Sequence, residues 1–137
     1  MSNKLAISGG TPVRTKPFPS WPVFGAAEEQ AVARAVKSGK WGKLDGKEVA
    51  TFERRFADYH QAKHGIGVVN GTVSLRIALL AAGIEAGDEV IVPPYTFLAT
   101  ATAVVESNAT PIFVDIDRAT LNVDPKAIEA AITPRTR

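Results

Sequence analysis

Between residues 65 and 132 the sequence alternates short apolar runs with helical patterns, and this alternation constrains the fold more than any other feature. The apolar runs predict three strands, near residues 66–69, 89–92 and 112–114. The helical patterns lie between and after them, at residues 72–82, 96–107 and 126–132. Strands that alternate with helices are typical of α/β folds, in which helical crossovers join parallel strands. We therefore expect a layered α/β domain with a mostly parallel sheet.

The residues before this region have a different character. Four of the nine prolines fall in residues 1–24. Proline fixes φ and lacks an N–H group, so this segment is predicted to be an extended arm rather than a helix or a central strand. Trp21, Val23 and Phe24 are its apolar anchors, which could dock on this chain or on a partner subunit. The predicted division is a proline-rich arm, 1–24, followed by a domain, 25–137.

Two further helices are predicted at the start of that domain. Apolar residues recur at helical spacing over residues 27–36 and again over 49–59. A glycine-rich loop, residues 39–46, joins the two helices and carries Trp41 and Lys43.

Composition narrows the classes of function. The chain has no cysteine, which excludes disulfide scaffolds and cysteine-ligated zinc. The net charge of +2 comes without a cluster of Lys and Arg, so no nucleic-acid partner is expected. No apolar stretch is long enough to span a bilayer and no signal-peptide pattern is present, so we expect a cytoplasmic protein. His60 and His64 are spaced to share a helix face, but no third ligand is nearby, and no metal site is expected.

The junction Asn70-Gly71-Thr72 lies between a predicted strand and a predicted helix. Gly71 would let a ligand approach the backbone closely, and the N–H groups of Thr72, Val73 and Ser74 would point at it. A helix N-terminus of this kind binds phosphate. The alternative is an ordinary turn in which Thr72 caps the helix. The sequence contains neither a Walker loop nor a dinucleotide-binding glycine motif at this position.

Two other candidate sites follow predicted strands. Tyr95 and Phe97 come after the second strand, where α/β sheets gather ligands, and an aromatic ring there could cover a flat heteroaromatic ligand. Core packing is the alternative for both rings. Asp115 and Asp117 come after the third strand, where they could act as an acid–base pair or simply cap a turn.

Several segments together resemble the DegT/DnrJ/StrS family of sugar aminotransferases. The resemblance rests on the order and spacing of residues 70–75, 87–97, 110–117 and 128–136. The head of the chain, with Gly9-Gly10-Thr11-Pro12 and its later prolines, is similar to members that act on cyclitols such as scyllo-inosose and to aminohydroxybenzoate synthases. The resemblance covers essentially the whole chain.

This resemblance implies a cofactor, pyridoxal 5′-phosphate, and a fold. The chain would be the N-terminal part of a fold type I large domain, a three-layer α/β/α structure whose sheet is incomplete. Gly71, Thr72 and Val73 would hold the cofactor phosphate, and Phe97 would stack on the pyridine ring. Trp41 and Lys43 would lie near the substrate entrance. The implied activity moves an amino group from glutamate or glutamine to a keto-sugar or keto-cyclitol, in a homodimer.

The family also needs a lysine that holds the cofactor covalently and a carboxylate near the pyridine nitrogen. None of the eight lysines stands in the family's lysine motif, so no catalytic residue is assigned. We therefore expect a truncated chain that is inactive by itself. Two alternatives stay open: a non-catalytic phosphate-binding or interaction domain, and a dehydratase relative with the same cofactor.

Overall fold

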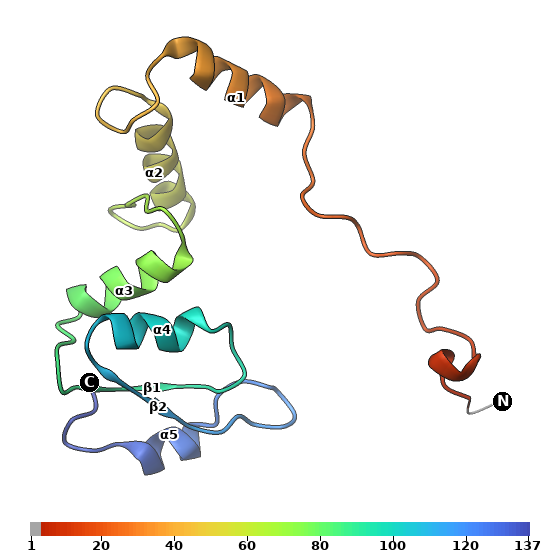
Figure 1. Cartoon of the computed structure of the whole chain (residues 1–137), viewed down its shortest axis with the longest axis vertical. Coiled ribbons are helices and arrows are strands. Elements are labelled where there is room, and N and C mark those ends of the chain that lie inside the picture. Colours follow the sequence, from red (N-terminus) through yellow and green to blue (C-terminus); the bar gives the residue numbers. More distant parts are fainter. Residues whose placement is uncertain (1–3) are drawn as a thin grey trace. The chain divides into compact units, whose positions relative to one another are not determined.

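The computed structural model describes residues 4–137, and the chain forms two compact units, Met1–Phe52 and Glu53–Arg137. The first unit contains a short 3-10 helix, Ala6–Ser8, and then a stretch from Gly9 to Gly25 without helix or strand. Helix α1 (Ala26–Ser38) follows, then a loop and the start of α2 (Glu48–Tyr59) (Figure 1).

Local interactions fix both ends of α1. At its start the Glu28 carboxylate accepts a hydrogen bond of 2.8 Å from the Gly25 N–H group. At its end Gly39 adopts a left-handed conformation with φ of 64°, and its N–H group bonds to the Val36 carbonyl. Glycine adopts that conformation without a steric penalty, which explains why the helix ends there.

The second unit has the predicted α/β order. After α2 come α3 (Gly71–Ala81), β1 (Glu89–Val92), α4 (Ala99–Glu106), β2 (Thr110–Phe113) and α5 (Pro125–Ala131). The two strands are parallel, with Glu89 opposite Thr110 and Val92 opposite Phe113. Helix α4 connects them, and in Figure 1 it lies on one side of the strands while α5 lies on the other. This is the layered crossover arrangement that the sequence predicts.

A small apolar core holds the strands to α4. Ile84, Val92, Val104 and Ala109 are buried together, with Leu79 and Val90 packed against them. The Asp124 side chain accepts a hydrogen bond from the Lys126 N–H group, and Pro125 is the first residue of α5, as predicted.

The predicted strand at 66–69 is wrong. Among the described residues no strand pairs with this segment, and Val69 is 85% exposed. The Gly67 N–H group donates instead to the Glu53 carboxylate, at 2.7 Å. A strand is defined by pairing with a neighbour, so an apolar run without one stays irregular. The third predicted strand also begins two residues earlier than expected, at Thr110.

None of the helices in the described part of the chain combines the length and the apolar character that crossing a bilayer requires.

Candidate functional site

The N-terminus of α3 presents unpaired donors to its surroundings. Asn70 caps the helix, because its side-chain oxygen accepts a hydrogen bond of 2.9 Å from the Val73 N–H group. The Ser74 N–H group makes the first bond of the helical ladder, to the Asn70 carbonyl. Within residues 4–137 the N–H groups of Gly71 and Thr72 and the Thr72 hydroxyl have no hydrogen-bond acceptor. These three donors can receive an anion at the positive end of the helix dipole.

This geometry corrects two details of the sequence interpretation. The N–H groups of Val73 and Ser74 were expected to be free, but the backbone and side chain of Asn70 already accept both. The cap is Asn70 and not Thr72. An asparagine directly before a helix that begins with glycine is a strong capping signal, and it could have been found in the sequence. Val73 as a cofactor contact stays a prediction.

The surroundings of Gly71 leave room for a ligand. A Cβ atom at this position would meet no heavy atom within 4 Å. The helix start is therefore open toward Gly71, and a bulky anionic group can approach the backbone there.

Tyr95 and Phe97 lie in the connection that follows β1. The two residues are 68% and 81% exposed, so the core of this chain covers neither ring. Helices α3 and α4 pack against each other, and Figure 1 shows both beginning at the end of this unit where β1 finishes. The capped start of α3 and the aromatic connection therefore face the same end of the α/β unit, which is the usual ligand end of a parallel sheet.

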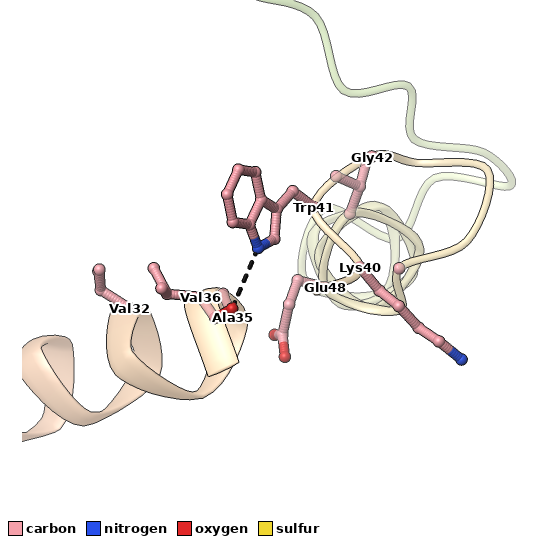
Figure 2. Close-up of a pocket in the computed structure, with 9 residues that line it drawn as sticks. Val32, Ala35, Val36, Lys40, Trp41, Gly42 and Glu48 are labelled. Atoms are coloured by element: carbon pink, nitrogen blue, oxygen red, sulfur yellow. Dashed lines mark hydrogen bonds between the residues drawn. The ribbon is translucent and has the colours of Figure 1, made fainter. Parts of the chain in front are cut away.

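Trp41 lies in a hollow of the first unit. The hollow has a volume of about 200 Å³ and is lined by residues from α1, the following loop and the start of α2. The Trp41 indole N–H group donates to the Val36 carbonyl at 3.2 Å, which fixes the ring beside α1 (Figure 2). Lys43 does not line this hollow. The two predicted substrate-binding residues thus lie in the first unit, whereas Gly71, Thr72, Val73 and Phe97 lie in the second.

Asp115 and Asp117 have the turn-capping geometry. Asp115 accepts a hydrogen bond from the Ile116 N–H group, and Asp117 accepts bonds from Thr120 and Ala119. The bonds from Thr120, and then that from Ala119, hold the pKa of Asp117 below its usual range. A general acid at neutral pH needs a raised pKa, so this arrangement argues against an acid–base role for Asp117.

Helix α2 ends at Tyr59, so His60 and His64 do not share a helix face as the sequence interpretation expected. The His60 ring lies against Phe56 and Tyr59, with centroid distances of 4.5 and 5.1 Å. In the part of the chain that the structure describes, no three His, Cys, Asp or Glu residues are grouped as metal ligands.

Comparison with known proteins identifies the family. The model of the DegT/DnrJ/EryC1/StrS aminotransferase family matches residues 23–137. The chain belongs to this family. Among curated relatives it is 50% identical over 141 residues to the L-glutamine:2-deoxy-scyllo-inosose aminotransferase of Streptomyces kanamyceticus, a match that covers 99% of this chain and 33% of the relative. It is 45% identical over 120 residues to the 3-amino-5-hydroxybenzoate synthase of Amycolatopsis mediterranei (strain S699), covering 88% of this chain and 31% of the relative.

Solved structures of the family show the same fold. The aminotransferase from Psychrobacter cryohalolentis matches with a TM-score of 0.84 and 44% identity over 88% of this chain and 31% of its own. The 3-amino-5-hydroxybenzoic acid synthase structure also gives 0.84, with 45% identity over 88% of this chain and 32% of its own. This DegT/DnrJ/EryC1/StrS family chain therefore has the fold of the N-terminal part of a fold type I large domain, with an incomplete parallel sheet. It spans about a third of the length of the curated relatives that it matches.

Proposed function

We propose that this chain provides part of the active site of a pyridoxal-phosphate-dependent aminotransferase. The match of residues 23–137 to the aminotransferase family carries this proposal. The amino donor is glutamine or glutamate, and the acceptor is a keto-cyclitol or keto-sugar. Relatives named for L-glutamine and 2-deoxy-scyllo-inosose favour glutamine and a keto-cyclitol within these classes. We also propose that the aminotransferase is a homodimer, as the family resemblance implies.

The residues at the ligand end of the second unit fit the cofactor's two recognisable parts. The free N–H groups of Gly71 and Thr72 and the Thr72 hydroxyl suit a phosphate, and the open space at Gly71 admits it. Val73 is kept as a proposed neighbour of the phosphate, although its N–H group donates to the Asn70 side chain. The exposed Phe97 ring suits the flat face of a pyridine. When bound, the cofactor supplies the electron sink for amino transfer, and these residues bind and orient it.

Trp41 and Lys43 are the proposed substrate contacts. The indole is held against α1 by its bond to Val36, so it offers a rigid apolar surface. Lys43 adds a positive charge to the same loop. We keep the proposed division into an arm, residues 1–24, and a large-domain part, residues 25–137.

By itself the chain is proposed to bind the cofactor weakly and not to catalyse. None of its eight lysines stands in the motif in which the family places its cofactor lysine. Without a covalent link, the cofactor is held only by the N–H groups of Gly71 and Thr72, the Thr72 hydroxyl and the Phe97 ring. The binding free energy that these contacts supply is little larger than the entropic cost of binding. The second candidate, a non-catalytic domain that binds phosphate, is favoured by the unpaired donors at the start of α3.

Titration of the 137-residue chain with pyridoxal phosphate tests the site. We expect weak, saturable binding that inorganic phosphate competes away. Thr72→Ala should weaken it about tenfold, because a hydrogen bond to a charged group contributes about 1.5–3 kcal/mol. Thr11→Ala, at an exposed threonine of the arm, is the matched control. If inorganic phosphate does not compete with the cofactor and Thr72→Ala does not change its affinity, the proposed phosphate site at the start of α3 is contradicted.

Borohydride reduction followed by peptide mapping tests the absence of a cofactor lysine. We expect only scattered, substoichiometric labelling of lysines. A single stoichiometric adduct, at Lys43 for example, would contradict the proposed inactivity.

The transfer itself is tested by giving the full gene product pyridoxal phosphate, glutamine and either 2-deoxy-scyllo-inosose or a keto-sugar nucleotide. Loss of the acceptor's oxygen without amination would identify the dehydratase alternative instead.

A further inference from the structure

A half-buried carboxylate on α2 holds the backbone of the segment that leads into α3. Glu53 lies in the middle of α2, and its Oε1 atom accepts a hydrogen bond of 2.7 Å from the Gly67 N–H group, 14 positions further along the chain. A hydrogen bond to a carboxylate is shorter and stronger than one between neutral groups. The side chain of one helix therefore fixes the backbone just before the next helix.

Two backbone contacts hold the same segment against α2. The Ala62 N–H group donates to the Ala57 carbonyl at 2.9 Å. A Cβ atom at Gly65 would lie 2.5 Å from the Glu53 carbonyl oxygen and 3.5 Å from the Ala57 Cβ, so the segment approaches the helix backbone directly. Figure 1 shows the chain after α2 turning back beside this helix before it reaches α3. The bond from Gly67 to Glu53 is the last of these contacts before the candidate phosphate site.

The short distance along the chain ties that site to Gly67. Asn70, the cap of α3, follows Gly67 by three residues. An extended chain spans at most 3.6 Å per residue, so a fixed Gly67 keeps Asn70 within about 11 Å. Asn70 is extended, with φ of −166° and ψ of 174°, and its side chain accepts from the Val73 N–H group. The positions of the Gly71 and Thr72 donors are therefore tied to that of Gly67.

We infer that Glu53 is a positioning residue for the cofactor phosphate: its carboxylate holds Gly67 and thereby places the donors of Gly71 and Thr72. This inference rests on the proposed phosphate site at the start of α3. A carboxylate repels a phosphate at contact distance, so Glu53 acts through the backbone and does not contact the ligand. Near the other end of α3, Leu79 packs against the apolar core, so the two ends of the helix are held by different contacts.

Phosphate binding by the full gene product, freed of its cofactor, tests this role. Calorimetric titration with inorganic phosphate measures the affinity. In Glu53→Ala we expect it to fall roughly tenfold, because the Gly67 N–H group loses a charged acceptor. Glu53→Gln keeps an oxygen acceptor without the charge, so the loss should be smaller, roughly threefold. Glu106→Ala and Glu106→Gln make the same changes at an exposed position of α4 and should leave the affinity unchanged.

Pyridoxal separates positioning from a general loss of stability. It lacks the phosphate group, so its affinity should be the same in the unmodified protein and in both Glu53 variants. Hydrogen exchange adds a local measurement. Exchange at the Gly67 amide should rise in both variants, whereas exchange at the Thr110 amide, which bonds to the Asp88 carbonyl, should not change.

The inference is overturned if both Glu53 variants bind phosphate as tightly as the unmodified protein, or if their affinities for phosphate and pyridoxal fall by the same factor. Should Glu53→Ala not fold, Glu53→Gln decides by the same criteria. Thr72→Ala distinguishes this failure from failure of the proposed site. If Thr72→Ala weakens phosphate binding and the Glu53 variants do not, the site stands and only the inference fails. If the unmodified protein does not bind phosphate, both fail.

Discussion

At the scale of single residues, Asn70 is the residue on which the geometry of the candidate phosphate site depends. Its side-chain oxygen accepts a hydrogen bond from the Val73 N–H group, and its carbonyl accepts one from the Ser74 N–H group. Within residues 4–137, the N–H groups of Gly71 and Thr72 are left without an acceptor and can bind a ligand. Asn70→Ala should lower the free energy of unfolding by about 1 kcal/mol, the usual cost of a lost cap. Urea unfolding followed by circular dichroism measures this change.

A matched substitution shows whether that loss comes from the cap. Asn122 is exposed and its side chain makes no hydrogen bond within residues 4–137, so Asn122→Ala should leave the unfolding free energy within about 0.5 kcal/mol. Equal effects of the two substitutions would contradict the role of Asn70 as a cap.

Asp117 gives a prediction about pH. Bonds from Thr120 and then Ala119 favour its charged form, so its pKa lies below the ordinary 3.8. The turn that it caps therefore gains stability above that value and loses it as the pH falls through the lowered pKa. In Asp117→Ala we expect faster amide exchange at Thr120 at pH 7, with the difference from the unmodified chain vanishing in acid. Asp58→Ala, on the exposed surface of α2, should have no effect at Thr120 at either pH.

At the scale of elements, the packing of residues 65–67 on α2 depends on a glycine. A Cβ atom at Gly65 would lie 2.5 Å from the Glu53 carbonyl oxygen, and the Gly67 N–H group bonds to the Glu53 carboxylate. Gly65→Ala should therefore push this segment away from α2 and destabilise the chain by about 1–3 kcal/mol, as overpacking does. Thermal unfolding compares it with Gly71→Ala, where a Cβ meets nothing within 4 Å. A lower melting temperature in Gly71→Ala than in Gly65→Ala would contradict this interpretation.

The same elements show what the sequence could and could not predict. The order from α3 to α5 follows from local signals, such as the Asp124-Pro125 start of α5 and the glycine at the start of α3. The strand at 66–69 was predicted from its apolar run alone, but strand formation depends on a neighbour that local sequence does not specify. The contact between Glu89 and Arg135 spans 46 residues and has no local signature. At the candidate site the sequence identified the helix start correctly and misassigned which donors are free.

At the scale of the whole molecule, many apolar side chains, above all those of α3, lie exposed outside the small core. Helix α3 is apolar at most positions, yet none of its residues is buried, and Leu75, Ile77 and Leu80 are each more than 40% exposed. A helix that is apolar on all sides is normally covered by other protein. The curated relatives that the chain matches are about three times as long. In the 137-residue chain this surface is available for association with other copies.

We therefore expect the 137-residue chain to self-associate at micromolar to millimolar concentrations. Sedimentation velocity over a concentration series should show an average mass that rises with concentration, and sulfate should strengthen the association because it favours apolar burial. Leu80→Lys places a charge on α3 and should weaken the association, whereas Asn122→Lys adds the same charge at an exposed polar position and should not. A chain that stays monomeric throughout, or an equal effect of the two lysines, would show that the apolar face of α3 does not drive association. An association lost only when Trp21 and Phe24 of the arm are replaced would assign it to the arm instead.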